Sequence, residues 1–131
     1  MSFNQVTALP EHACVEAIID GYEDWDSATD SIVEMTELAE IYNWSRILID
    51  FTRVNLRVAL VEAPEIAKFF NSFATRTLDV GVRLPEAERD ITVIQTFADS
   101  LGAFGHQITQ LRSDIDREIW LAGPQSCAAN G

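Results

Sequence analysis

Three short groups of polar side chains stand directly after apolar runs of the sequence, where they are suited to hold an anion. Guanidinium groups bind carboxylates and phosphates through several N–H donors. If the apolar runs are parallel strands, the groups meet at the carboxyl edge of one sheet, where open parallel sheets bind ligands. Solvated loop ends are the alternative. The predicted ligand-binding residues are Asp50, Thr52, Arg53, Arg83, Arg112, Ser113 and Asp114.

Five carboxylates gather between positions 20 and 30 and allow two interpretations. They could ligate a hard cation, but they lack the spacing, central glycine and terminal glutamate of a calcium loop. Acids in the first turn of a helix also favour the helix dipole, by about 0.3–1 kcal/mol each when exposed. We therefore predict a capped helix N-terminus and no metal site. The five are Asp20, Glu23, Asp24, Asp26 and Asp30.

The remaining reactive side chains do not form a catalytic pattern. His12 and His106 each lack a partner at ligand spacing, and Cys14 is expected to pack as a small apolar residue. Gly102 and Gly105 follow an expected helix, whereas a phosphate cradle precedes one, so they predict helix termination. With no paired nucleophile and base, the sequence predicts neither catalytic residues nor a cofactor.

The bulk composition is that of a globular chain of one domain. Its 131 residues are 47% hydrophobic and carry a formal net charge of −12. A field of this sign repels nucleic-acid phosphates and anionic membrane surfaces, so neither is an expected partner. No secretory signal stands out, and no apolar run approaches the roughly 20 residues that span a bilayer. Cysteines only at 14 and 127 make a structural disulfide unexpected, and a cytoplasmic location is predicted.

The apolar run Ile47-Leu48-Ile49 is the centre of the predicted fold. Such a run is typical of a strand buried on both faces, within a parallel sheet that helices cover. The elements around it predict an α/β domain of order β-β-α-β-α-β-α-β-α. The sheet is expected to be mostly parallel, with right-handed crossovers and an N-terminal hairpin at one edge. The predicted strands are 3–9, 12–19, 46–52, 78–84 and 106–111.

Some internal boundaries depend on single residues. Gly21 is expected to end the second strand, and Asp90 to cap the helix that follows the fourth. Residues 56–63 fit a loop, a strand or a helix. We prefer a loop from Arg53 that runs into a helix, regular by Pro64.

The end of the chain is expected to hold one more short helix. Ser113 with Asp116 three residues on resembles a capping box. The residues after it are small and polar. We predict a single domain over residues 1–122 and a flexible tail over 123–131.

Three segments resemble a known group of proteins. They are similar to the central strand and its turn, the third helix, and the closing strand and helix of the SpoIIAA-like superfamily. That superfamily includes the STAS domains of anti-sigma factor antagonists, and the likeness is to its uncharacterised bacterial STAS-like branch. The segments are 47–54 (ILIDFTRV), 97–102 (FADSLG), and 106–114 (HQITQLRSD) running on to 119–121 (IWL).

The resemblance implies a β-α superhelical sheet and, for the best-known members, protein–protein regulation. Those members carry a phosphorylatable serine at the start of the helix that follows the central strand. Here the corresponding positions hold Val58, Ala59 and Leu60. Phosphorylation acts by adding charge at a hydroxyl, so a switch of that type is not expected in this chain.

The sequence therefore predicts a non-catalytic regulatory or protein-interaction module that lacks the phosphoacceptor serine. Its partner is expected to be another protein or a second copy, as a homodimer. The alternative is a domain that binds a small anionic or lipid-like molecule. Phe69, Phe70 and Phe73 could line a lipid pocket, although an aromatic stripe of this spacing is more typical of a core.

Overall fold

The computed structural model describes the backbone of residues 4–130 and the side chains of residues 4–123. Within that range the predicted order of strands and α-helices is confirmed. The strands are β1 (Gln5–Leu9), β2 (Cys14–Glu23), β3 (Arg46–Leu56), β4 (Asp79–Arg83) and β5 (Gln107–Leu111). The helices are α1 (Trp25–Tyr42), α2 (Ala63–Phe73), α3 (Glu88–Ala103) and α4 (Asp114–Asn130), with 3-10 turns η1 (Pro10–His12) and η2 (Leu60–Glu62).

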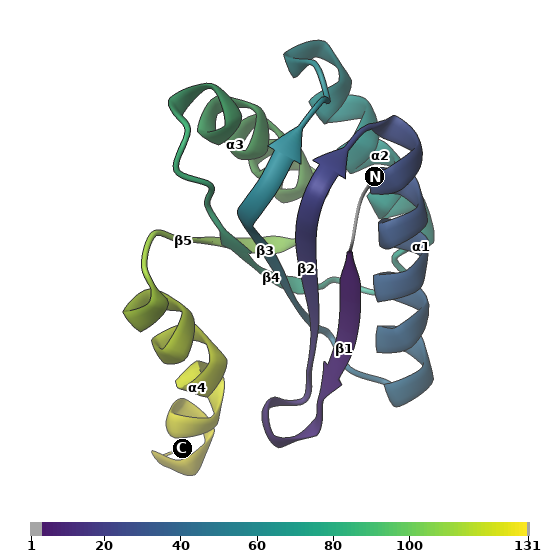
Figure 1. The fold of residues 1–131 in the computed structure, drawn as a ribbon. Coiled ribbons are helices and arrows are strands. Elements are labelled where there is room, and N and C mark those ends of the chain that lie inside the picture. The colour runs from purple at the N-terminus through teal and green to yellow at the C-terminus, as the bar shows by residue number, and fades with distance from the viewer. Residues whose placement is uncertain (1–3, 131) are drawn as a thin grey trace.

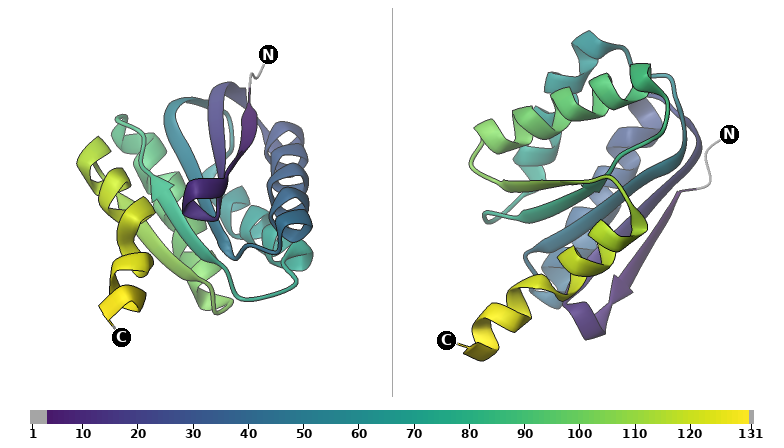
Figure 2. Two further views of the ribbon diagram at one scale, coloured as in Figure 1. Left: turned by 90° about the horizontal axis from the view of Figure 1, so that it is seen from below. Right: turned by 90° about the vertical axis from the view of Figure 1, so that its left-hand side faces the viewer.

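The strands form one sheet whose spatial order follows the chain, β1-β2-β3-β4-β5. β1 pairs with β2 in antiparallel fashion, as the predicted hairpin edge, and the other three pairs are parallel. Right-handed crossovers that always advance in one direction place their helices on one face of a sheet. Figures 1 and 2 show α1, α2 and α3 on that face, and α4 as the helix on the opposite face.

The central strand lies between two apolar layers, as predicted. Ile47, Leu48 and Ile49 are 0%, 0% and 1% exposed. Ile47 and Ile49 belong to the main core, between the sheet and the three crossover helices. Leu48 points the other way, into a smaller cluster under α4. The unbroken apolar run of the sequence is thus explained by burial on both faces.

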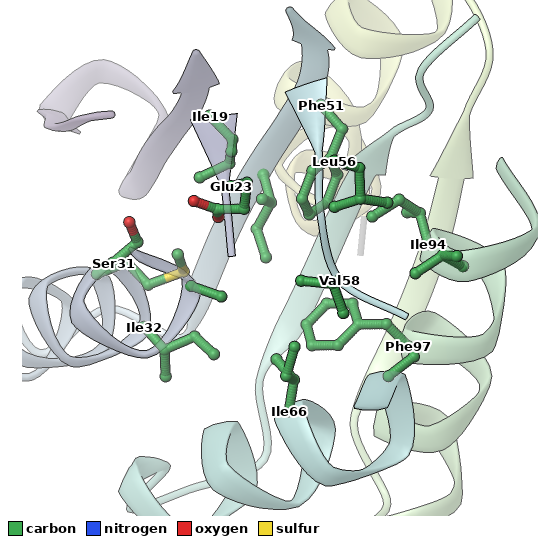
Figure 3. Close-up of a pocket in the computed structure, with 15 residues that line it drawn as sticks. Ile19, Glu23, Ser31, Ile32, Phe51, Leu56, Val58, Ile66, Ile94 and Phe97 are labelled. Carbon is green, nitrogen blue, oxygen red and sulfur yellow. The ribbon is translucent and has the colours of Figure 1, made fainter. Parts of the chain in front are cut away.

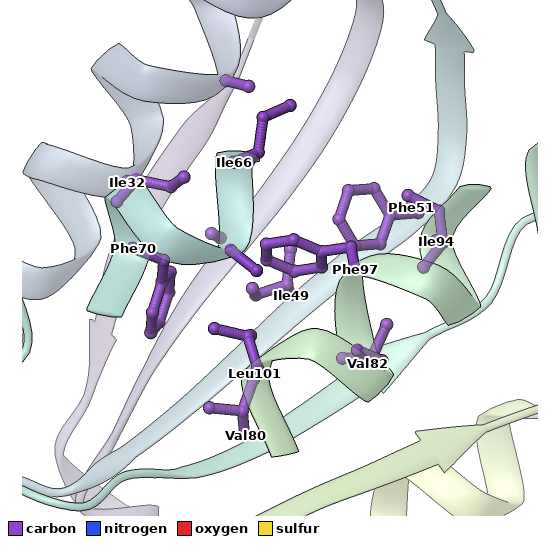
Figure 4. Packing of buried hydrophobic residues seen from close by; sticks show 14 of the residues in the cluster. Ile32, Ile49, Phe51, Ile66, Phe70, Val80, Val82, Ile94, Phe97 and Leu101 are labelled. Atoms are coloured by element: carbon purple, nitrogen blue, oxygen red, sulfur yellow. The ribbon is translucent and has the colours of Figure 1, made fainter. Parts of the chain in front are cut away.

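The main core is closed by aromatic side chains from the helices (Figure 4). Phe70 of α2 and Phe97 of α3 meet edge to face, with ring centroids 6.3 Å apart. Phe70 is fully buried, whereas Phe73 is exposed. Only part of the predicted aromatic stripe is therefore core.

β2 and β3 extend beyond their predicted ends. Gly21 does not end β2, because at φ 82° it continues the strand to Glu23. Residues from Arg53 onward pair with β2 as strand, so the predicted loop there is wrong as far as Leu56. Between Ile18 and Asp20 the register shifts, and two residues of β3 oppose one of β2.

The N-terminal ends of the helices agree with prediction except at α3. Asp24 caps α1, accepting a hydrogen bond from the Ser27 N–H at 2.9 Å. The Asp90 cap is wrong, because α3 already begins at Glu88 after an N-cap at Ala87. Asp90 is instead an acid in the first turn, where the helix dipole favours it.

One aromatic residue and one arginine dock α4 on the sheet. Trp120 lies over Gly81, where an added Cβ would stand 2.9 Å from the indole ring. The Arg46 guanidinium carbon is 4.1 Å from the Trp120 ring centroid. Arg46 also donates to the Trp120 and Leu121 carbonyl oxygens and pairs with Asp79 at 3.5 Å. The Trp120 carbonyl needs such a donor because the residue four positions on is Pro124, which has no N–H.

α4 is longer than the predicted short helix and runs to Asn130. The predicted domain boundary at 122 falls inside it, and the flexibility of residues 123–131 stays a prediction. Cys14 is buried and unpaired by disulfide, donating its thiol to the Val15 carbonyl at 3.4 Å. The Cys127 side chain, and with it the prediction that no disulfide joins it to Cys14, lies outside the described residues.

Candidate functional site

Part of the predicted anion site forms a hollow at the carboxyl ends of β4 and β5. The register places Asp50 beside Arg83, and Arg83 beside Leu111, so the polar groups that follow these strands come together. The hollow has a volume of about 280 Å³. Its lining consists of Thr52, Arg83, Leu84, Pro85, Glu86, Ile91 and Arg112.

The charges in this hollow partly cancel. The Arg83 Nη2 atom is 3.3 Å from Asp114 Oδ1, and Glu86 places a carboxylate in the lining itself. Arg112 forms no ion pair with any other described residue. Arg112 therefore provides the positive charge that is free to attract an anion.

The other predicted site residues have local roles. Arg53 turns away to Asp20, 3.7 Å distant, and does not line the hollow. Asp50 accepts hydrogen bonds from the Thr52 N–H and hydroxyl at 2.8 and 2.7 Å, which fixes the strand at the register shift. Ser113 accepts from the Asp116 N–H at 3.1 Å, as the capping box predicts.

A second candidate site was not predicted from the sequence. It is a cavity of about 40 Å³ between the sheet, α1, α2 and α3 (Figure 3). Its walls are apolar and include Ile32, Phe51, Val58, Ile66 and Phe97. Two polar residues, Glu23 and Ser31, also line it. None of the three phenylalanines of the predicted stripe does.

Glu23 is an acid inside the apolar core, 3% exposed. Its Oε1 atom accepts from Asn4 Nδ2 at 3.0 Å and from the Ser27 hydroxyl. Its Oε2 atom has no hydrogen-bond partner among the described residues. Burial raises the pKa of Glu23, the bonds from Ser27 and Asn4 lower it, and the Asp24 charge adds to the rise.

The alternation of β2 contains the signal that could have revealed Glu23. Val15, Ala17 and Ile19 face the core, and Gly21 and Glu23 continue the same period of two. If the strand is predicted to end at Gly21, Glu23 falls outside this pattern and among the surface acids at the start of α1.

A third feature is an apolar surface beside η2. Leu60 and Val61 are 47% and 80% exposed. Next to them is a groove of about 300 Å³, lined by Val58, Leu60, Arg89, Thr92 and Val93. We call Leu60, Val61 and this groove the η2 surface. It lies just before α2, the helix that follows the central strand.

The two reactive side chains inside the fold have structural partners. His106 Nδ1 accepts from the Leu78 N–H at 3.0 Å, so its Nε2–H donates to Asn71 Oδ1, also at 3.0 Å. Burial lowers the pKa of His106, which keeps the ring neutral. Burial also raises the pKa of the Cys14 thiol to about 12, which makes it a poor nucleophile.

Two further findings concern the described residues as a set. None of their helices is both long and apolar enough to cross a membrane. No three of their histidine, cysteine, aspartate and glutamate side chains gather as metal ligands would.

Comparison with solved structures confirms the fold class. The chain is similar to the unphosphorylated anti-sigma factor antagonist SpoIIAA, with a TM-score of 0.54 over 92% of this chain and 99% of that one. The two sequences are 13% identical, so the likeness is one of fold. No family model and no curated protein matches the sequence. The molecule is an α/β protein with the SpoIIAA-like, or STAS-like, fold.

Proposed function

We propose that this chain is a non-catalytic regulatory module that acts in the cytoplasm by binding another protein or a second copy of itself. The observation that carries the proposal is the similarity to SpoIIAA, an anti-sigma factor antagonist, over nearly the full length of both chains. His106, whose two ring nitrogens both bond within the fold, and the buried Cys14 thiol support a non-catalytic role. The net charge of −12 disfavours nucleic acid and anionic membranes as partners.

The η2 surface is the docking site in this proposal. Apolar side chains as exposed as Leu60 and Val61, beside an open groove, are typical of contact residues. The surface stands where the resemblance to STAS domains implies regulation, at the start of the segment that leads into α2. Positions 58–61 carry no hydroxyl, so we propose that docking here does not depend on a phosphoserine.

Binding measured with and without the η2 surface tests this proposal. The double substitution Leu60→Ser, Val61→Ser removes the apolar contact while leaving Val58 in the core. We expect it to abolish partner capture in affinity purification and self-association in sedimentation velocity. The matched control is Ile115→Ser, Ile119→Ser, which alters two exposed apolar residues of α4. Equal binding by both variants and the wild type would reject the η2 surface.

The strand-end hollow supports a second candidate function, the binding of a small anion. Thr52 of β3, Arg83 of β4 and Arg112, which directly follows β5, converge there. Titration calorimetry with inorganic phosphate tests it. We expect Arg112→Gln to abolish binding and Arg53→Gln, outside the hollow, to leave it unchanged. Phosphate binding that both variants retain in full would remove this site.

A further inference from the structure

The cavity between the sheet and α1–α3 has an unmet hydrogen-bond acceptor and an unmet donor at one end. Glu23 is only 3% exposed. Its Oε2 atom nevertheless accepts no hydrogen bond from any described residue. Ser31 Oγ accepts from Asn4 Nδ2 at 2.6 Å, and its own O–H donates to no described group. Asn4 bonds to both residues, which holds them close together.

We propose that this cavity binds the hydroxyl group of a small aliphatic alcohol. A hydroxyl donates one hydrogen bond and accepts others, so it can donate to Glu23 Oε2 while accepting from the Ser31 O–H. The alkyl part then lies against apolar walls such as Ile32, Phe51 and Ile66. An ammonium group would satisfy Glu23 but has no acceptor for the Ser31 proton.

The size of the cavity sets where the alkyl chain goes. A volume of about 40 Å³ holds the hydroxyl and the first carbons only, since an apolar cavity of about 150 Å³ is needed for benzene. Val58 and Val93 line both this cavity and the outer groove of about 300 Å³. A longer chain therefore passes between these two side chains into the groove. Val58 precedes η2 in a segment outside the sheet and helices, which allows it to shift.

An isomeric pair of probes tests the proposal. 1-Pentanol and methyl butyl ether have the same atoms, but only the alcohol has a hydrogen to donate. We expect 1-pentanol to shift the amide resonances of Glu23, Ser31 and Val58 in a ¹H–¹⁵N titration, and the ether to bind about tenfold more weakly, the value of one hydrogen bond. Pentylammonium, the form of pentylamine at neutral pH, donates but cannot accept a hydrogen bond, so it should also bind more weakly than the alcohol.

Two substitutions separate the polar end from the walls. Ser31→Ala and Glu23→Gln should each weaken 1-pentanol binding, and Ser31→Ala should leave ether binding unchanged. Thr29→Ala, half-buried on the same helix but outside the cavity lining, is the control, and circular dichroism verifies folding. Val61→Ser, at a residue that lines neither the cavity nor the groove, should retain alcohol binding, so this test is independent of partner docking. Equal affinities for 1-pentanol and the ether would overturn the proposal. So would a titration in which the amide resonances of the cavity residues do not shift, because the cavity then holds only water.

Discussion

At the residue scale, burial changes the chemistry of Glu23 by raising the pKa of its carboxyl group. In the unfolded chain its proton leaves near the ordinary pKa of 4.5, and burial makes the folded chain hold the proton to higher pH. Between these two pKa values the folded state binds more protons than the unfolded state. The contribution of Glu23 to the free energy of unfolding is therefore full at low pH and falls as pH rises through this window.

This shift predicts a pH-dependent difference between the wild type and Glu23→Gln. Glutamine keeps the size of the side chain but does not ionise. The free energy of unfolding of the variant should therefore rise relative to the wild type as pH increases above 4.5. Urea unfolding at a series of pH values measures the difference between the free energies of unfolding of the two proteins. The titration of the other carboxylates cancels from this difference because both proteins contain them. A difference independent of pH would show that Glu23 titrates normally.

Gly81 is a second residue where one atom decides the packing. An added Cβ would stand 2.9 Å from the indole of Trp120. We expect Gly81→Ala to lower the free energy of unfolding by about 1–3 kcal/mol, the usual cost of overpacking. Thermal and urea unfolding measure it.

Gly102→Ala is the matched control for that substitution. Its Cβ would meet only Ile108 Cγ1, at 3.9 Å, and the position is helical. This variant should be unchanged or more stable by up to about 1 kcal/mol. If Gly81→Ala were equally benign, α4 would not be packed on the sheet as described.

The sequence predicted the role of a residue where that role depends on its immediate neighbours. It did not predict the role where that depends on residues distant in the sequence. The Asp24 cap and the Ser113 capping box follow from their immediate neighbours. Arg53 and Arg112 look equivalent in sequence, but only Arg112 lines the hollow, because Asp20 on the neighbouring strand pairs with Arg53. That pairing depends on a register shift that the sequence does not show.

At the element scale, Arg46 holds α4 in place. It bonds to two carbonyl oxygens of the helix, stacks on Trp120 and pairs with Asp79. Lysine retains the charge but neither the planar stacking surface nor the forked set of donors. We expect Arg46→Lys to cost about 1.5–3 kcal/mol, as for hydrogen bonds to a charged group, and to speed amide exchange in α4.

Arg76→Lys is the control for that prediction. Arg76 pairs with Glu40 at 3.7 Å, near the surface, where an ion pair contributes little. The free energy of unfolding of Arg76→Lys should stay within about 0.5 kcal/mol of that of the wild type. If the amide hydrogens of α4 exchanged as slowly in Arg46→Lys as in Arg76→Lys, the proposed role of Arg46 would be wrong.

The elements themselves were predictable where periodicity is strong. The stripes of α1 and α2 and the alternation of β2 gave correct element types. The ends of β2 and β3 were not predictable, because Gly21 is a common strand breaker that here adopts a positive φ within a paired strand. The cavity was missed for the same reason, since its polar end depends on that extension.

At the scale of the whole molecule, topology divides the two faces of the sheet. Sequential strand order and right-handed crossovers bring three helices to one face, which buries most of the apolar side chains. The other face has α4 and a small cluster around Leu48, Trp120 and Leu121. This asymmetry was predictable from the order of elements. The exposed η2 surface was not predictable, because the exposure of Leu60 and Val61 depends on how the chain leaves β3.

Crosslinking within the cell tests most directly whether a partner docks on the η2 surface, as we propose. A photo-crosslinking amino acid is placed at position 61 and, in a separate protein, at position 115, where Ile115 of α4 is 72% exposed. We predict that position 61 yields one defined adduct, with a second copy or another protein, that Leu60→Ser abolishes, and that position 115 yields none. No adduct at 61, or the same adducts at both positions, would contradict the claim.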